Sequence, residues 1–236
     1  EWHVDPEIPM SEDCLYLNIW TPAVTGNEKL PVYVWYFGGA FQCGYTAEME
    51  FDGERLARRG IVVVTVNYRV NVFGFLAHPE LTAENPDAPA NFGCLDQQAG
   101  LLWVKRNIAA FGGDPDRITI GGQSAGGASV MAQLNNPVSA ACVSHAVVES
   151  GIFCLPYEKP RLSTLAELEK QGEEFFRFLG IHSLAEARAL PAVFLRDKME
   201  EFGLFWSVVA DGKFQQRTSW QTALRGELPD IPMLIG

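Results

Sequence analysis

A serine flanked by glycines stands in the run Gly122-Gln123-Ser124-Ala125-Gly126, between residues that favour a strand and residues that favour a helix. This G-x-S-x-G pattern is typical of a nucleophile elbow, a tight strand–turn–helix that holds a serine hydroxyl in a strained, exposed position. The glycines are needed because a Cβ at either position would collide with the neighbouring strand or helix. A glycine-rich turn with a surface serine is the alternative. The context favours Ser124 as a nucleophile for acyl transfer.

Acyl transfer from an ester also needs hydrogen-bond donors that stabilise the oxyanion of the tetrahedral intermediate. In this arrangement one donor is the backbone N–H of the residue after the nucleophile, here Ala125, and another comes from a glycine-rich loop after an earlier strand. The run Gly38-Gly39-Ala40 follows the strand-like residues 32–37. We therefore expect this loop to lie beside the serine, although a plain turn would use the same small residues.

A serine nucleophile is activated by a histidine base that an acid orients. The sequence has four histidines, His3, His78, His145 and His182. In enzymes with this kind of elbow the histidine follows the serine in the chain. Two candidates are left, His145 and His182. His145 is expected at the wrong end of a strand over 146–149, and His182 lies in a polar joint between two helices. We therefore expect the acid and the base to lie beyond Gly236.

The composition excludes several classes of protein. With 236 residues, 47% of them hydrophobic, the chain suits one sizeable globular domain. The formal net charge of −11 comes without a basic stripe, which argues against nucleic acid as a partner. No apolar run is long enough to span a membrane. The five cysteines are too scattered for a disulfide framework or a metal site: Cys14, Cys43, Cys94, Cys142 and Cys154.

Short runs rich in β-branched and aromatic residues indicate strands at 15–20, 32–37, 61–68, 118–121 and 146–149. Helical patterns over 96–107 and 125–134 lie between them or follow them. This alternation predicts an α/β fold, with a mostly parallel central sheet flanked by helices on both faces. Because sites in such sheets lie at the carboxyl ends of the strands, the glycine loop and the serine are expected at the same edge.

Residues 156–204 have a different pattern, which indicates a helical insertion beside the sheet. Thr164-x-x-Glu167 is a capping box that opens a helix expected to end near Gly180, and a second box begins at Ser183. Four aromatic residues could line an apolar pocket or could simply form the core of this part: Phe194, Phe202, Phe205 and Trp206.

The two ends of the sequence carry little information about the compartment. The chain starts without methionine and without a signal-peptide pattern, and residues 231–236 resemble a strand. We therefore expect both ends to be cut. Localisation and oligomeric state stay open.

Several ordered blocks of sequence match one known family. They are Ser11-Glu12-Asp13-Cys14-Leu15-Tyr16-Leu17-Asn18, Asn67-Tyr68-Arg69, Phe73-Gly74-Phe75-Leu76, Asn91-x-Gly93-x-x-Asp96-Gln97, Phe111-Gly112-Gly113-Asp114-Pro115 before the serine motif, and Glu149-Ser150-Gly151. On these blocks the chain resembles the type-B carboxylesterase/lipase family of α/β-hydrolases, and within it the bacterial para-nitrobenzyl-esterase-like members. The match spans nearly all of residues 11–155 and, more loosely, 205–236.

The resemblance implies hydrolysis of small-molecule carboxylic esters through an acyl-serine intermediate on Ser124, without metal or cofactor. It assigns the oxyanion donors to the backbone N–H groups of Gly39, Ala40 and Ala125. It also implies a single partial α/β-hydrolase domain, incomplete at both ends. Its expected divisions are a sheet core over 11–155, a helical insertion over 156–204 and a return to the sheet over 205–236.

The resemblance further implies a buried structural salt bridge between Arg69 and Asp96. It places the acid, usually Glu, shortly after residues 231–236 and the histidine much later, so the chain is expected to cover about half the usual length. Glu12 and Cys14 resemble residues whose partners, an arginine and a second cysteine, would lie upstream.

Three positions depart from the family pattern. Phe37 stands where many members have His, Ala40 replaces a third glycine, and Gln123 replaces the usual Glu before the nucleophile. The last change removes a negative charge, so no preference for cationic esters is expected. The alternatives are a non-catalytic binding module, an inactive fragment, and a lipase, which would need a lid upstream or around residues 43–60.

Overall fold

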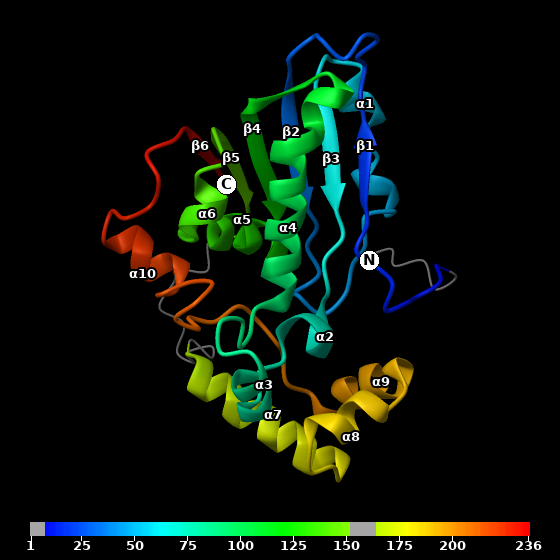
Figure 1. Ribbon diagram of the computed structural model, residues 1–236, viewed down its shortest axis with the longest axis vertical. Helices are drawn as coiled ribbons and strands as arrows, with labels where there is room; N and C mark the ends of the chain where they lie inside the picture. The colour runs from blue at the N-terminus through cyan, green and yellow to red at the C-terminus, as the bar shows by residue number, and fades with distance from the viewer. Residues whose placement is uncertain (1–7, 152–163) are drawn as a thin grey trace.

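The computed structural model describes residues 8–151 and 164–236. Within these residues, six strands form one sheet in the order β1-β3-β2-β4-β5-β6 (Figure 1). The strands are β1 (Leu17–Trp20), β2 (Leu30–Tyr36), β3 (Val62–Val66), β4 (Gly113–Gln123), β5 (His145–Glu149) and β6 (Met233–Ile235). β1 runs antiparallel to β3, and the other neighbours are parallel. The mostly parallel sheet predicted from the sequence is therefore confirmed.

Two long helices, α4 (Phe92–Asn107) and α5 (Ala125–Asn135), cover one face of this sheet. Side chains alternate between the two faces of a strand and recur every three or four residues on a helix, so each element contributes one row to the core. The buried residues on this side include Val32, Val34, Ile118 and Ile120 from the strands and Leu101, Val104, Val130 and Leu134 from the helices.

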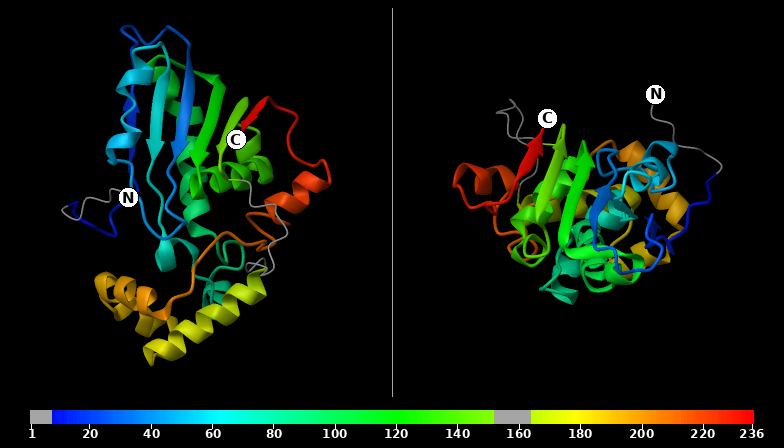
Figure 2. Two further views of the ribbon diagram at one scale, coloured as in Figure 1. Left: turned by 180° about the vertical axis from the view of Figure 1, so that it is seen from behind. Right: turned by 90° about the horizontal axis from the view of Figure 1, so that it is seen from above.

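The opposite face is covered only in part by the described residues. η1 (Met49–Phe51) and α1 (Glu54–Ala57) lie on this side, where the rings of Trp35 and Phe51 are 5.6 Å apart. An open pocket of about 500 Å³ lies there, with Tyr33, Trp35 and Gln123 in its lining. Figure 2, left, shows the sheet from this side. The expectation of helices over both faces therefore holds fully for one face and partly for the other.

A further group of helices lies beyond the carboxyl ends of the strands (Figure 1). It consists of α2 (Asn71–Phe75), α3 (Pro79–Glu84), α7 (Leu165–Leu179), α8 (Leu184–Ala189) and α9 (Ala192–Phe202). Of the four aromatic residues considered above, Trp206 is fully buried in this core and Phe202 packs against it. Phe194 and Phe205 are exposed, at 38% and 71%. The core interpretation therefore holds for two of the four.

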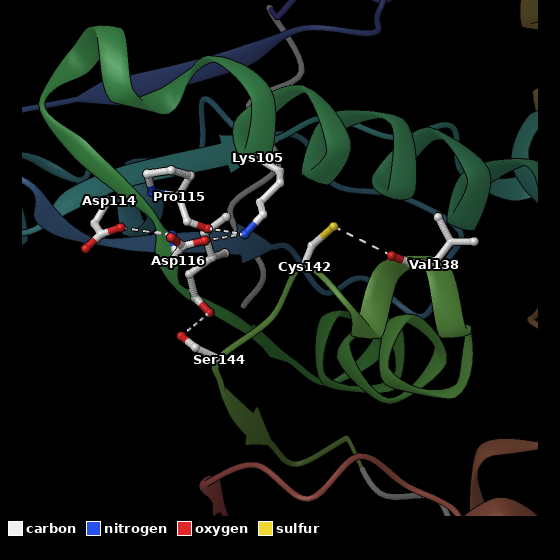
Figure 3. A network of polar contacts seen from close by, with 8 residues as sticks. Lys105, Asp114, Pro115, Asp116, Val138, Cys142 and Ser144 are labelled. Carbon is white, nitrogen blue, oxygen red and sulfur yellow. Dashed lines mark hydrogen bonds and ion pairs between the residues drawn. The ribbon is translucent and has the colours of Figure 1, made fainter.

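The amino ends of β4 and β5 carry a separate polar network (Figure 3). Lys105 Nζ donates to Pro115 O at 2.7 Å and to Asp116 Oδ1 at 2.9 Å. Ser144 Oγ donates to Ile118 O at 2.9 Å. These contacts hold α4 and β5 at the start of β4, which is the edge of the sheet opposite to Ser124.

Several elements differ from the expected ones. β4 begins at Gly113 rather than residue 118, and α4 begins at Phe92 rather than residue 96. Four short helices were not predicted, namely α2, α3, α6 (Pro137–Ala140) and α10 (Ser219–Leu224). The capping box of Thr164 is present, and α7 ends at Gly180 in a left-handed conformation. Three features named above lie outside the described residues. They are His3, Cys154 and the expected boundary between residues 155 and 156.

Two features of the described residues concern possible partners. None of their helices combines the length and apolar character needed to cross a bilayer. No cluster of three or more His, Cys, Asp or Glu among them is arranged to hold a metal ion. The cysteines in this part of the chain are free thiols, namely Cys14, Cys43, Cys94 and Cys142.

Candidate active site

Ser124 sits in a strained turn between β4 and α5. Its φ is 55° and its ψ is −120°, a conformation that L residues rarely adopt and that costs about 1–3 kcal/mol. Neighbouring elements hold the turn, because Ser124 N donates to Glu149 O at 2.8 Å and Ser124 O accepts from Ala128 N at 2.9 Å. No described residue hydrogen-bonds to Ser124 Oγ. The geometry is that of a nucleophile elbow with an available hydroxyl.

The two glycines of the motif allow the backbones to approach closely. A Cβ on Gly122 would lie 2.4 Å from the carbonyl carbon of Gly126, and a Cβ on Gly126 would lie 2.0 Å from Tyr36 O. Both contacts are with backbone, which cannot rotate away. The first contact joins the strand to the helix that follows it, and the second joins that helix to β2. The motif therefore fixes α5 against both central strands.

The register of the sheet brings the glycine-rich loop to the same edge as the elbow. β2 and β4 are parallel, and Tyr36 pairs with Gly122. Gly39 and Ala125 each come three residues after this pair, so the chain leaves both strands at the same level. This register places the glycine loop and the serine at the same edge of the sheet, as expected from the sequence.

The backbone N–H groups of Gly39, Ala40 and Ala125 lie at this edge and have no acceptor among the described residues. Ala125 is the first residue of α5, where the N–H groups are free and the helix dipole is positive. In contrast, Gly39 O accepts from Gln42 N at 2.8 Å and from Cys43 N at 3.2 Å. Since a trans peptide directs its C=O and its N–H to opposite sides, these bonds turn the Ala40 N–H away from the loop interior.

Phe37, one of the departures from the family pattern, has a clear packing role. Its ring is buried and stacks on Tyr68, with ring centroids 4.1 Å apart. The Tyr68 hydroxyl donates to Phe37 O at 2.6 Å, and burial raises the pKa of Tyr68 well above its usual value. The phenol therefore stays a neutral donor that anchors the end of β2 directly before the glycine loop.

The histidines in the described residues lie in other parts of the fold and do not contact Ser124. His145 is the first residue of β5 and pairs with Thr119, five residues before Ser124 along the parallel strand. That separation corresponds to about 16 Å. His182 lies between α7 and α8, where its backbone N–H donates to Glu186, and His78 caps α3 and stacks on Phe176. The described residues therefore bring no histidine to Ser124.

Cys43 lies in the same loop but lacks the character of a nucleophile. Its Sγ contacts Gly39 O at 3.7 Å. Partial burial and, secondly, the charge of Glu48 raise the pKa of the thiol, so it stays protonated near neutral pH. A reactive thiolate needs the opposite environment.

Arg69, in the loop after β3, and Asp96, on α4, form a two-pronged ion pair. Arg69 Nε lies 2.7 Å from Asp96 Oδ2, and Nη2 lies 2.8 Å from Oδ1. Arg69 N also donates to Asp96 Oδ2 at 3.0 Å. The Asp96 side chain is 7% exposed and that of Arg69 is 37% exposed, so the bridge is only half buried. The hydrogen bond to Asp96 raises the pKa of Arg69.

We expect Asp96→Asn to lower the free energy of unfolding by about 2–3 kcal/mol. The change removes an ion pair that also bonds the Arg69 backbone, and breaking a fully buried pair costs about 3–5 kcal/mol. Asp116→Asn is the matched control, because Asp116 is 84% exposed in its pair with Lys105 and should cost less than about 1 kcal/mol. Denaturant unfolding measures both, and equal losses would contradict a structural role for the bridge.

A serine elbow and free backbone donors at the carboxyl edge of a mostly parallel sheet define an α/β-hydrolase. The comparisons with known proteins agree with this class. The chain belongs to the Carboxylesterase family, whose model matches residues 2–236.

Individual esterases, compared by sequence and by solved structure, are also similar to this chain. The chain is 46% identical over 232 residues to the fumonisin B1 esterase of Sphingopyxis macrogoltabida, covering 96% of this chain and 42% of that protein. It is 38% identical over 236 residues to the para-nitrobenzyl esterase of Bacillus subtilis, covering 98% and 47%. The carboxylesterase EST55 structure from Geobacillus stearothermophilus superposes with a TM-score of 0.85 at 40% identity, covering 96% and 47%. The chain therefore spans about half the length of these relatives.

Proposed function

We propose that the protein to which this chain belongs hydrolyses carboxylic esters through an acyl-serine intermediate on Ser124. One observation supports this most strongly. A serine in a strained elbow lies at the sheet edge where backbone N–H groups from two separate segments have no acceptor among the described residues. Such an arrangement suits a tetrahedral intermediate, in which a carbonyl oxygen becomes an anion.

The proposed reaction has two halves. Ser124 Oγ attacks the ester carbonyl carbon, and the oxyanion accepts hydrogen bonds from the N–H groups of Gly39, Ala40 and Ala125. Collapse of the intermediate releases the alcohol and leaves the acyl group on Ser124, and water then releases the acid by the same route. Fixed donors of this kind are worth about 10²–10³ in rate each.

The general base and its acid partner are, in this proposal, supplied by residues outside these 236. Two facts support this. None of the described histidines hydrogen-bonds to Ser124, and the matching relatives are about twice as long. The salt bridge of Arg69 and Asp96 is proposed to hold the loop after β3 and to take no part in the chemistry.

The substrate class is proposed as small-molecule carboxylic esters, with no preference for cationic ones. The names of the relatives refer to quite different esters, fumonisin B1 and para-nitrobenzyl esters, so the family fold does not fix the alcohol or the acyl group. Gln123 carries no charge, so its side chain would not select an ionic substrate by electrostatic attraction.

Covalent labelling tests the proposal. The complete product of the reading frame that encodes this chain is treated with a fluorophosphonate probe, and peptide mass spectrometry locates the adduct. We expect the adduct on Ser124, and its loss after heat denaturation, because labelling requires the folded site. An adduct on another serine, or equal labelling of denatured protein, would overturn the assignment.

Expression of the 236 residues alone extends the same test. Without a base, we expect p-nitrophenyl ester turnover to be lower than that of the complete product by about 10²–10⁴-fold, the usual worth of general acid–base catalysis. Equal turnover would contradict the placement of the base outside these 236 residues and would make His145 and His182 the first histidines to test by substitution.

A further inference from the structure

The side chain of Gln42 links the glycine loop to a segment far away in the sequence. Its Nε2 donates to Ala40 O at 2.9 Å and to Trp206 O at 2.6 Å. Its Oε1 accepts from Trp206 N at 3.4 Å. One amide therefore contacts the loop carbonyl and both backbone groups of a residue 164 positions further along the chain.

The loop needs such support because its backbone is strained. Ala40 and Phe41 have φ values of 55° and 64°, in the left-handed region, although neither is glycine. Conformations of this kind persist only when the surroundings hold them. Gly39 O is held by the turn to Gln42 and Cys43, and Phe41 O accepts from Asn71 N at 2.6 Å. Ala40 O lies between them, and a side chain, that of Gln42, holds it.

The anchor at the other end is rigid. Trp206 is fully buried and packs edge-to-face on Phe175 of α7, with ring centroids 5.8 Å apart. Gln171 Nε2 donates to the neighbouring carbonyl, Phe205 O, at 3.1 Å. Buried Asn91 pairs with both backbone groups of Val209, at 2.9 and 3.1 Å. Amide side chains thus hold the segment 205–209 on both sides of the Gln42 contact.

We propose that Gln42 is a positioning residue for the oxyanion donors. It ties the peptide that follows Ala40 to the Trp206 backbone and so fixes the Ala40 N–H in place. This inference rests on the proposed ester hydrolysis. The oxyanion exists in the transition state and not in the bound ester, so a displaced donor lowers kcat and leaves KM nearly unchanged.

Two variants of Gln42 separate its interactions. Gln42→Leu keeps the approximate size and removes every hydrogen bond. Gln42→Glu keeps an acceptor for Trp206 N but removes the donor to Ala40 O and to Trp206 O. In the complete protein we expect both to lower kcat for p-nitrophenyl butyrate by about 10–100-fold, less than the 10²–10³ of a lost donor, with KM changed less than about threefold. A lower kcat for Gln42→Leu alone would assign the effect to the bond from Trp206 N and would overturn the proposed tie through Ala40 O.

Gln216→Leu is the matched control. Gln216 Nε2 also donates to a backbone carbonyl, Gly212 O, at 2.6 Å, but within its own surface turn. We expect kcat and KM to stay at the wild-type values. A loss of kcat in this control equal to that in Gln42→Leu would show that any lost glutamine has this effect, and would overturn the positioning role.

Hydrogen exchange provides a readout that does not require turnover. In Gln42→Leu, mass spectrometry should show faster exchange in peptides covering 38–44 and 204–209, with the sheet unchanged. Unchanged exchange in both peptides, or an unchanged kcat in an active protein, would overturn the inference. A wild-type protein that hydrolyses no ester would instead overturn the proposed function, and the exchange result would still decide whether Gln42 holds the loop.

Discussion

Replacing Ser124 by alanine is expected to lower kcat/KM for p-nitrophenyl butyrate by about 10⁴-fold or more in the complete protein. Loss of the nucleophile removes the acyl-serine route, and only the donors and the binding surface are left to act on a water molecule. The fold should survive, because Ser124 Oγ makes no hydrogen bond to the described residues and the helix cap uses backbone groups. Steady-state kinetics and a thermal melt together measure this result.

Ser144→Ala serves as the control for this substitution. It deletes the same atom from the opposite edge of the sheet, where Ser144 Oγ bonds Ile118 O (Figure 3). We expect its kcat/KM to match the wild type. Turnover of Ser124→Ala within tenfold of the wild type would sink the nucleophile assignment, because an acyl-serine route cannot run without its serine.

Gly126→Ala is expected to reduce the free energy of unfolding by about 3–5 kcal/mol and to abolish ester hydrolysis. The new Cβ would lie 2.0 Å from Tyr36 O and 2.9 Å from Phe37 O. Relief requires α5 to move away from β2, which opens the core between them and shifts Ser124 relative to the glycine loop. Overpacking against backbone lies at the severe end of core substitutions. Denaturant unfolding and kinetics measure the two effects.

Gly180→Ala distinguishes this clash from a general cost of losing glycine. Gly180 ends α7 with a φ of 71°, and nothing lies within 4 Å of an added Cβ. Its only cost is the left-handed backbone, about 1 kcal/mol. If both variants lost the same stability, the close approach of α5 and β2 would not be the reason for Gly126.

Elements with strong local signals were predicted well from the sequence. The helix α7 begins at the capping box of Thr164 and ends at Gly180, as its cap residues indicate. The valine-rich run of β3 is buried along its whole length, as expected for a central strand. In these places the local preference and the tertiary environment favour the same conformation.

Short elements and element ends that depend on distant contacts were missed. The α4 helix starts early because Asn91 adopts a φ of 58° and pairs with Val209, whereas a typical N-cap is extended. Gly74 of α2 packs so closely that a Cβ would lie 2.0 Å from Arg69 O. The early start of β4 pairs Gly113 with Leu30 across an irregularity. Periodicity within a short window carries no information on such contacts.

The candidate site likewise has features that the sequence predicts and features that depend on distant contacts. Ser124 and the glycine loop follow from motifs, and their shared edge follows from a parallel sheet. The contact of Gln42 with Trp206 had no signal, because glutamine in a loop is usually solvated and its partner is 164 residues away. The pairing of Asn91 with Val209 was equally hidden, although Asn91 stood in a recognised block.

The candidate donors at Gly39, Ala40 and Ala125 are main-chain atoms, and this affects how such a protein can diverge. A codon change alters a side chain but leaves the backbone N–H in place, except when it introduces proline. Descendants can therefore exchange the residues around the serine, as with Phe37 and Gln123, and still carry the same donors. Selection can then change the substrate preference, while the proposed donors, and with them the proposed reaction, are inherited with the fold.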